Sequence, residues 1–81
     1  MVLELWAPSA DRVVVVGSFD GWQEHPLERR GRWWAVALEV QPGTWEYAYL
    51  VDGEPVAPPE AALHRDDGFG GRNGVLVVEE P

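Results

Sequence analysis

The residue types that perform acid–base and metal chemistry are scattered along this chain rather than grouped. Asp66 and Asp67 are adjacent, so their side chains diverge along an extended backbone and do not form the facing carboxylate pair that glycoside hydrolysis requires. His25 and His64 lie far apart in the sequence, and because there is no cysteine, a zinc site is not expected. The sequence therefore predicts neither an enzyme nor a bound metal or cofactor.

A tryptophan in a predicted loop is the strongest candidate for a binding residue. Residues 17–22 read Gly-Ser-Phe-Asp-Gly-Trp, follow four consecutive valines and precede a polar segment broken by proline. No strand pattern buries the indole of Trp22 at this position, and its exposure costs about 25 cal/mol per Å² of apolar surface. Trp22 therefore either contacts a ligand or folds back over Pro26 and Leu27 to cap the edge of the fold.

The charge balance narrows the classes of partner. Fourteen acidic residues against six basic ones give a net charge of −8, which opposes binding to nucleic acid or anionic lipid and favours a neutral or apolar partner. The N-terminus lacks the basic and apolar stretches of a signal peptide, and no run approaches the length of a membrane span. We therefore expect no membrane partner and, with cysteine absent, a cytoplasmic protein.

The elements that position these residues are predicted to be strands. Short β-like runs punctuated by Gly, Pro and an Asp-Gly pair recur about every ten residues, which is typical of an all-β sandwich, and no helical period is present. We expect one domain over residues 1–81 with strands at 2–6, 12–17, 33–40, 44–51 and 75–79. Residues 41–43 are predicted to form a hairpin connection, 52–53 a tight turn, 54–63 an irregular segment with room for a short edge strand, and 66–74 a flexible loop.

The aromatic residues of the predicted strands divide between core and surface. Alternation along 33–40 places Trp34 inward and Trp33 outward. The same argument predicts five core aromatics, namely Trp6, Trp34, Trp45, Tyr47 and Tyr49.

In four ordered segments the chain resembles the family-48 carbohydrate-binding modules. They are Trp-Ala-Pro-Ser-Ala at 6–10, Val-Gly-Ser-Phe-Asp-Gly-Trp at 16–22, Gly-Thr-Trp-Glu-Tyr-Ala-Tyr-Leu-Val-Asp-Gly at 43–53 and Asn-Gly-Val-Leu-Val-Val at 73–78. That family includes the glycogen-binding domain of the AMP-activated protein kinase β subunit and the N-terminal domains of isoamylases and glycogen-branching enzymes. The resemblance covers almost the whole chain and implies an immunoglobulin-like β-sandwich of the early-set type.

The resemblance also implies a ligand and the residues that bind it. Members of the family hold α-1,4-glucan on one side of the sandwich, by stacking aromatic rings against sugar faces and by hydrogen bonds to the hydroxyl rim. By motif, the stacking ring is Trp22, the Asn before the final strand is Asn73, and Phe69 falls where an apolar loop residue reaches into the ring of sugars. Two positions depart from the kinase-type pattern, because its lysine is Ala48 here and its second stacking Trp is Pro55.

Three of the candidate residues have an alternative role. Trp33, expected beside the strand that contains Ala48, either supplies the second stacking ring or packs on a neighbouring arginine. Asn73 either donates its amide to a sugar hydroxyl or forms a turn with Gly74. Phe69 lies in a glycine-flanked loop, where it either closes over a ligand or plugs the bottom of the sandwich as a core residue.

Together these observations predict a non-catalytic module that binds an α-glucan polysaccharide or oligosaccharide. A glycogen-metabolising enzyme or a regulatory protein is a second candidate partner. The alternative is a protein-interaction or structural domain that keeps the early-set fold and has lost sugar binding, as Ala48, Pro55 and an apolar edge around Leu50 and Val56 suggest.

Overall fold

Runs of β-branched and aromatic residues form strands where the sequence predicts them, because such side chains fit a pleated, half-buried surface. The computed structural model describes residues 1–80, in which nine strands and one turn of 3₁₀ helix follow in the order β1 (Val2–Trp6), β2 (Val13–Gly17), η1 (Ser18–Asp20), β3 (His25–Pro26), β4 (Glu28–Arg30), β5 (Trp33–Ala37), β6 (Gly43–Val51), β7 (Glu54–Val56), β8 (His64–Asp66) and β9 (Arg72–Val78). The predicted edge strand after the Asp52-Gly53 turn is confirmed as β7.

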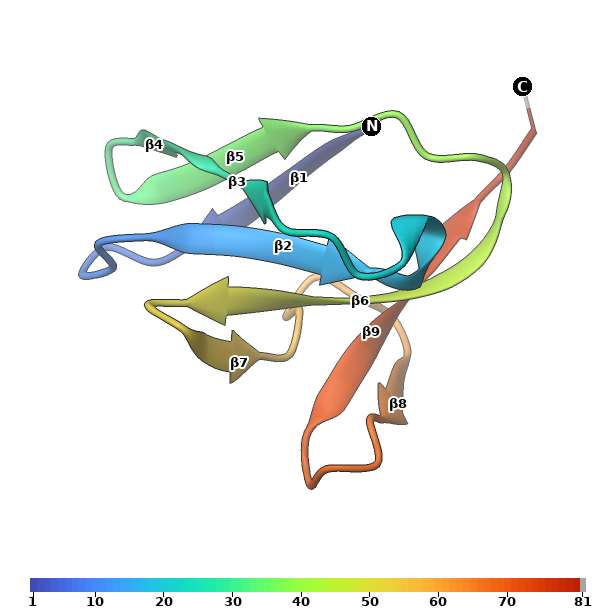
Figure 1. Ribbon diagram of the computed structural model, residues 1–81. Helices are drawn as coiled ribbons and strands as arrows, with labels where there is room; N and C mark the ends of the chain where they lie inside the picture. Colours follow the sequence, from blue (N-terminus) through green and yellow to red (C-terminus); the bar gives the residue numbers. More distant parts are fainter. Residues whose placement is uncertain (81) are drawn as a thin grey trace.

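The strands form two antiparallel sheets that pack face to face (Figure 1). The small sheet has the order β1-β5-β4, and the large sheet has the order β3-β2-β6-β9-β8 with β7 paired to β6. The predicted all-β sandwich is confirmed, and its early-set type stays a prediction.

The core lies between the two sheets and is built from alternate residues of each strand, as a period of two requires. Tyr47 and Tyr49 in β6 are buried, as is Trp34 in β5. The other buried apolar residues of this core are Leu3, Leu5, Ala10, Val13, Val15 and Leu27. The remaining residues of these strands point to the outer faces, where ligands have access.

The prediction that Trp6 is a core residue was wrong. Successive residues of β1 point to opposite faces, and Leu3 and Leu5 are the buried ones. Trp6 therefore points to the outer face, where it is 50% exposed. Trp45 is only half-buried, and its Nε1 donates a hydrogen bond to the Gln41 carbonyl oxygen at 2.9 Å.

The predicted hairpin at 41–43 is also wrong, because β5 and β6 belong to different sheets. β5 ends at Ala37, and the chain then crosses from the small sheet to the large sheet (Figure 1). The Leu38 amide still donates to the Met1 carbonyl oxygen at 2.8 Å, which extends the pairing of β1 and β5. Two strands that face each other across a sandwich have the same inward alternation as two neighbours in one sheet, so the pattern did not separate these cases.

The segment 66–74, predicted as a flexible loop, contains a tight turn between two paired strands. Oδ1 of Asp67 accepts hydrogen bonds from the amides of Phe69 and Gly71 at 2.7 and 3.0 Å, which closes the turn. β9 therefore begins at Arg72, and Asn73 lies inside the strand instead of in a turn. Gly74 is required by close packing, since an added Cβ would lie 2.9 Å from atoms of Tyr47, Pro58 and Ala61.

The segment 57–63 covers one end of the core through a shared carboxylate. The hydroxyls of Tyr47 and Tyr49 both donate to Oε2 of Glu60, each at 2.7 Å. Burial and the neighbouring Glu60 carboxylate raise the pKa of both hydroxyls well above the ordinary value. Pro58, within the same segment, is buried.

Candidate functional site

The centre of the outer face of the large sheet is an apolar floor. Val16 in β2 lies opposite Ala48 in β6, and Leu50 in β6 lies opposite Pro55 in β7. A groove of about 380 Å³ lies above this floor, and its remaining lining residues are Trp22, Asp67, Phe69 and Asn73. The groove thus joins two loops and four strands that are far apart in the sequence.

Trp22 reaches the groove from the turn that follows β2. Its amide donates to the Gly17 carbonyl oxygen at 2.9 Å, and Asp20 contacts the imidazole of His25. Trp22 itself has a φ of 67°, in the left-handed region that bulky residues rarely adopt. Such a conformation persists only where the surroundings over-determine it, and it is most common at binding and active sites. The side chain is 44% exposed and lines the groove.

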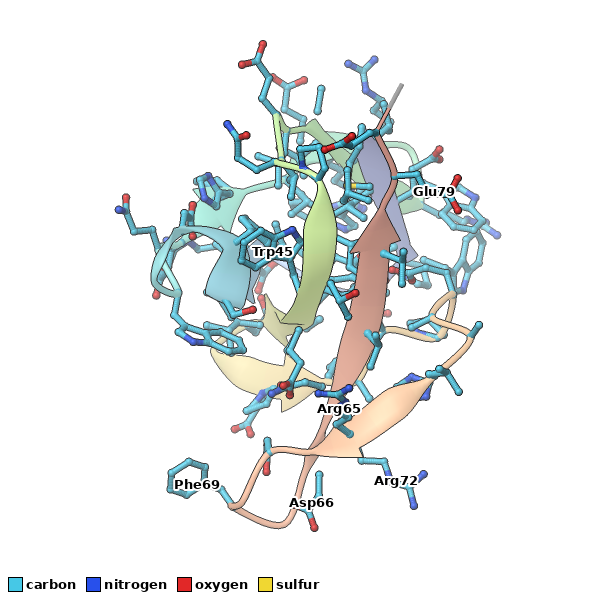
Figure 2. All side chains as sticks on the ribbon, turned by 90° about the vertical axis from the view of Figure 1, so that its right-hand side faces the viewer. Trp45, Arg65, Asp66, Phe69, Arg72 and Glu79 are labelled. Carbon is cyan, nitrogen blue, oxygen red and sulfur yellow. The ribbon has the colours of Figure 1, made fainter. Side chains whose placement is uncertain are left out.

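Phe69 lies at the edge of the groove, on the tip of the β8–β9 hairpin. Its side chain is 95% exposed, so the alternative in which it plugs the core is wrong. Figure 2 shows the ring extending from the hairpin tip, on the side opposite to Arg72. The turn that carries Phe69 is held by Asp67, which also lines the groove.

A polar cluster borders the groove on β6, β8 and β9. Nδ2 of Asn73 donates to Oε1 of Glu46 at 3.4 Å, and Nη1 of Arg65 lies 3.8 Å from Oε2 of Glu46. Arg65 pairs with Asn73 across the β8–β9 ladder, which places both on this outer face. The cluster presents a guanidinium, an amide and a carboxylate beside an apolar floor, so it can both donate and accept hydrogen bonds.

Sequence reasoning missed Glu46 and Arg65 as candidate site residues. Glu46 precedes Ala48 by two residues in β6, so both point to the same face, and the alternation in the sequence already indicated this. Arg65 had no such signal, because β8 is only three residues long and exposed throughout.

Of the four predicted site residues, the structure brings Trp22, Phe69 and Asn73 to one groove and separates Trp33 from them. Trp33 was expected beside the strand of Ala48, but β5 belongs to the small sheet. Its ring contacts Trp6 edge to face, with centroids 5.4 Å apart. Trp33 therefore cannot contact a ligand in this groove together with Trp22.

The described part of the chain contains no cluster of three or more His, Asp or Glu side chains placed to hold a metal ion. Within residues 1–80, no helix has the length and apolar character needed to span a membrane.

The chain is similar in sequence to several known proteins. A family model described as the glycogen recognition site of AMP-activated protein kinase matches residues 2–81. The chain is 33% identical over 63 residues to SNF1-related protein kinase regulatory subunit beta-2 of Arabidopsis thaliana, covering 76% of this chain and 22% of that protein. It is 29% identical over 76 residues to the chloroplastic PTST homolog 2 of the same plant, covering 91% of this chain and 14% of the relative. A 1,4-alpha-glucan branching enzyme, GlgB 2 of Xanthomonas campestris pv. campestris, is 39% identical over 75 residues, covering 72% of this chain and 10% of the enzyme.

The chain thus spans less than a quarter of the length of each of these relatives. The family match, by contrast, extends over almost all of its residues and confirms the resemblance seen in the four sequence segments. This chain belongs to the family of glycogen-recognition, family-48 carbohydrate-binding modules.

Proposed function

We propose that residues 1–81 act as one non-catalytic module that binds α-1,4-glucan, as glycogen, starch or maltooligosaccharide, in the groove on the large sheet. The observation that carries this proposal is the convergence of Trp22, Phe69 and Asn73 on one groove from separate loops and strands. Family membership supports the same class of ligand.

The chemistry of the groove suits a sugar ring. The C–H faces of glucose are apolar, so an indole and an aliphatic floor of Val16, Ala48 and Leu50 can cover them at little entropic cost. The hydroxyl rim then meets the polar cluster. Arg65 supplies a cationic donor on a face where Ala48 replaces the lysine of the kinase-type module.

The affinity expected from a single stacking ring is modest. With Pro55 in place of the second Trp, we expect a dissociation constant on the order of millimolar to high micromolar, or about −4 to −6 kcal/mol. Binding to a polymer with many equivalent ends raises the effective affinity, as does a glycogen-metabolising enzyme or regulatory protein that carries the module.

The test is a ¹⁵N-HSQC titration with maltoheptaose, comparing the native chain with Trp22→Ala and with Leu63→Ala, an exposed residue that does not line the groove. We expect saturable shifts at residues 22, 69 and 73, which are lost in Trp22→Ala and kept in Leu63→Ala. Cellohexaose, in which the linkage is β-1,4, should produce smaller shifts. Groove signals that stay unchanged at several millimolar maltoheptaose would reject this function.

A second candidate function follows from the floor itself. Ala48 and Pro55 leave the floor without a polar side chain, which also suits an apolar segment of a protein partner. If maltoheptaose leaves the groove signals unchanged, the domain is instead a protein-interaction or structural member of the family. Addition of a candidate partner protein should then broaden the signals of residues 16, 48 and 50.

A further inference from the structure

The outer face of the small sheet is a second surface on which aromatic and polar side chains alternate. The registers of β1 with β5 and of β5 with β4 place its outward residues in three rows. The first row is Trp6, Trp33 and Arg30, the second is Glu4, Ala35 and Glu28, and the third is Val2 and Ala37. Neighbouring rows are about 7 Å apart, which follows from the rise along a strand.

The two indoles of the first row are left open to solvent. Trp6 is 50% exposed and Trp33 is 47% exposed, and their rings meet at an interplanar angle of 70°. In an edge-to-face pair, one ring keeps a face that its partner does not cover. Large exposed aromatic surfaces are uncommon on a small protein and mark surfaces that bind a ligand or a partner.

A trough of about 580 Å³ lies on the same face; the two indoles do not line it, but Arg30, which shares their row, does. Ala35 and Ala37 form part of its floor, while Glu4 and Glu28 stand on opposite sides of it, on β1 and β4. Nη2 of Arg30 donates to Oε2 of Glu28 at 3.3 Å, so the guanidinium is directed along the trough wall. The remaining lining residues, Val2, Pro26 and Val36, are apolar like the two alanines.

We propose that the Trp6–Trp33 pair and this trough form a second saccharide-binding site, which makes the module bivalent for glucan. A flat indole beside carboxylates and a guanidinium matches the alternation of C–H faces and hydroxyl groups on a sugar chain. The charges are mixed and exposed, so they suit a neutral ligand that donates hydroxyl hydrogens to Glu4 and Glu28. The proposal rests on the proposed function for the class of ligand, but it uses none of the residues of the groove.

The two sites face in opposite directions, since they lie on the outer faces of the two sheets (Figure 1). The molecule measures 33 × 32 × 22 Å, so a short oligosaccharide cannot bridge both faces. Each site would therefore hold a separate glucan chain, and a branched polymer would be bound with avidity.

The test follows maltoheptaose binding by ¹⁵N-HSQC in the native chain, Trp22→Ala, Trp33→Ala and Trp33→Phe, with Val77→Ala, an exposed residue that lines neither the groove nor the trough, as the control. We expect two independent sets of shifts, one at the groove and one at residues 4, 6, 28, 30 and 35. Trp33→Ala should abolish the second set alone, Trp22→Ala the first set alone, and Trp33→Phe should keep part of the second. Each single Trp→Ala change should weaken co-sedimentation with glycogen at least tenfold.

The outcomes separate the two proposals. Groove shifts with an unchanged small sheet would overturn the second site and leave the proposed function in place. Shifts at the small sheet without shifts at the groove would overturn the proposed groove site and leave the second site in place. A spectrum that is unchanged throughout would overturn both, and dispersed amide signals in every variant would show that the fold is intact.

Discussion

Tyr47 and Tyr49, which follow each other on the inner face of β6, donate their hydroxyl hydrogens to the same oxygen, Oε2 of Glu60. Their rings meet edge to face with centroids 6.0 Å apart. One carboxylate thus satisfies two phenols at the end of the core and ties the proline-rich segment 57–63 to it. The same segment passes over Gly74, next to the candidate site residue Asn73.

Glu60→Ala should lower the free energy of unfolding by about 2–3 kcal/mol, because the part-buried hydroxyls of Tyr47 and Tyr49 lose a charged acceptor. Glu60→Gln keeps a neutral acceptor, so its free energy of unfolding should fall by less. Urea unfolding measures both, with Glu54→Ala, an exposed change on β7, as the control. A Glu60→Ala variant as stable as the control would show that water replaces the carboxylate without loss.

Stability should fall as the pH rises above about 10. Burial and Glu60 raise the folded-state pKa of Tyr47 and Tyr49, so the unfolded chain releases its phenol protons first. Above the unfolded pKa of about 10, the folded state binds more protons, and each tyrosine lowers the free energy of unfolding by up to about 1.4 kcal/mol per pH unit. Below about pH 10 the stabilising contribution of the two tyrosine hydroxyls is fully present.

Denaturant melts from pH 8 to 11.5 measure this slope. Tyr47→Phe and Tyr49→Phe should each remove part of it. A native protein whose stability is level between pH 10 and 11.5 would contradict the assigned environment of these hydroxyls.

Gly74→Ala should destabilise the fold by about 1–3 kcal/mol, because the new methyl would overlap Tyr47, Pro58 and Ala61. Val77→Thr, an exposed change in the same strand, should stay within about 0.5 kcal/mol of the native chain. Thermal melts compare the two variants. Equal melting temperatures would mean that the segment above Gly74 moves aside freely.

Arg65→Ala should raise the dissociation constant for maltoheptaose by about threefold to tenfold, equivalent to about 0.7–1.4 kcal/mol. The guanidinium stands beside Glu46 and Asn73 at the edge of the groove, where it can reach sugar hydroxyls. Arg72→Ala is the matched control, because its side chain projects from the other side of the same hairpin (Figure 2). Equal affinities for the two variants would remove Arg65 from the binding surface.

Much of the fold follows from local pattern. The bounds of β1 agree with the prediction, and those of β2 and β6 differ by one residue, because period-two alternation and turn residues act within a few positions of each strand. The three-residue β8 escaped prediction, since none of its residues is buried and no alternation marks it.

The candidate site was predictable only in part. Trp22, Phe69 and Asn73 stand out as residue types in loops or at a strand start, and the structure brings them to one groove. Trp33 was assigned to the wrong sheet, and Trp6 to the core, because an indole is apolar enough for either face and only the burial of Leu3 and Leu5 sets the parity.

Local chemistry in the sequence was enough to establish the class of fold, most strand positions, the family and the absence of any cysteine chemistry. The pairing of strands between two sheets required the folded chain, because neighbours in a sheet and partners across a sandwich bury the same alternate residues. That pairing separates Trp33 from Trp22, joins Arg65 to Asn73 and Glu46, and places the groove and the Trp6–Trp33 pair on opposite sides of a single core.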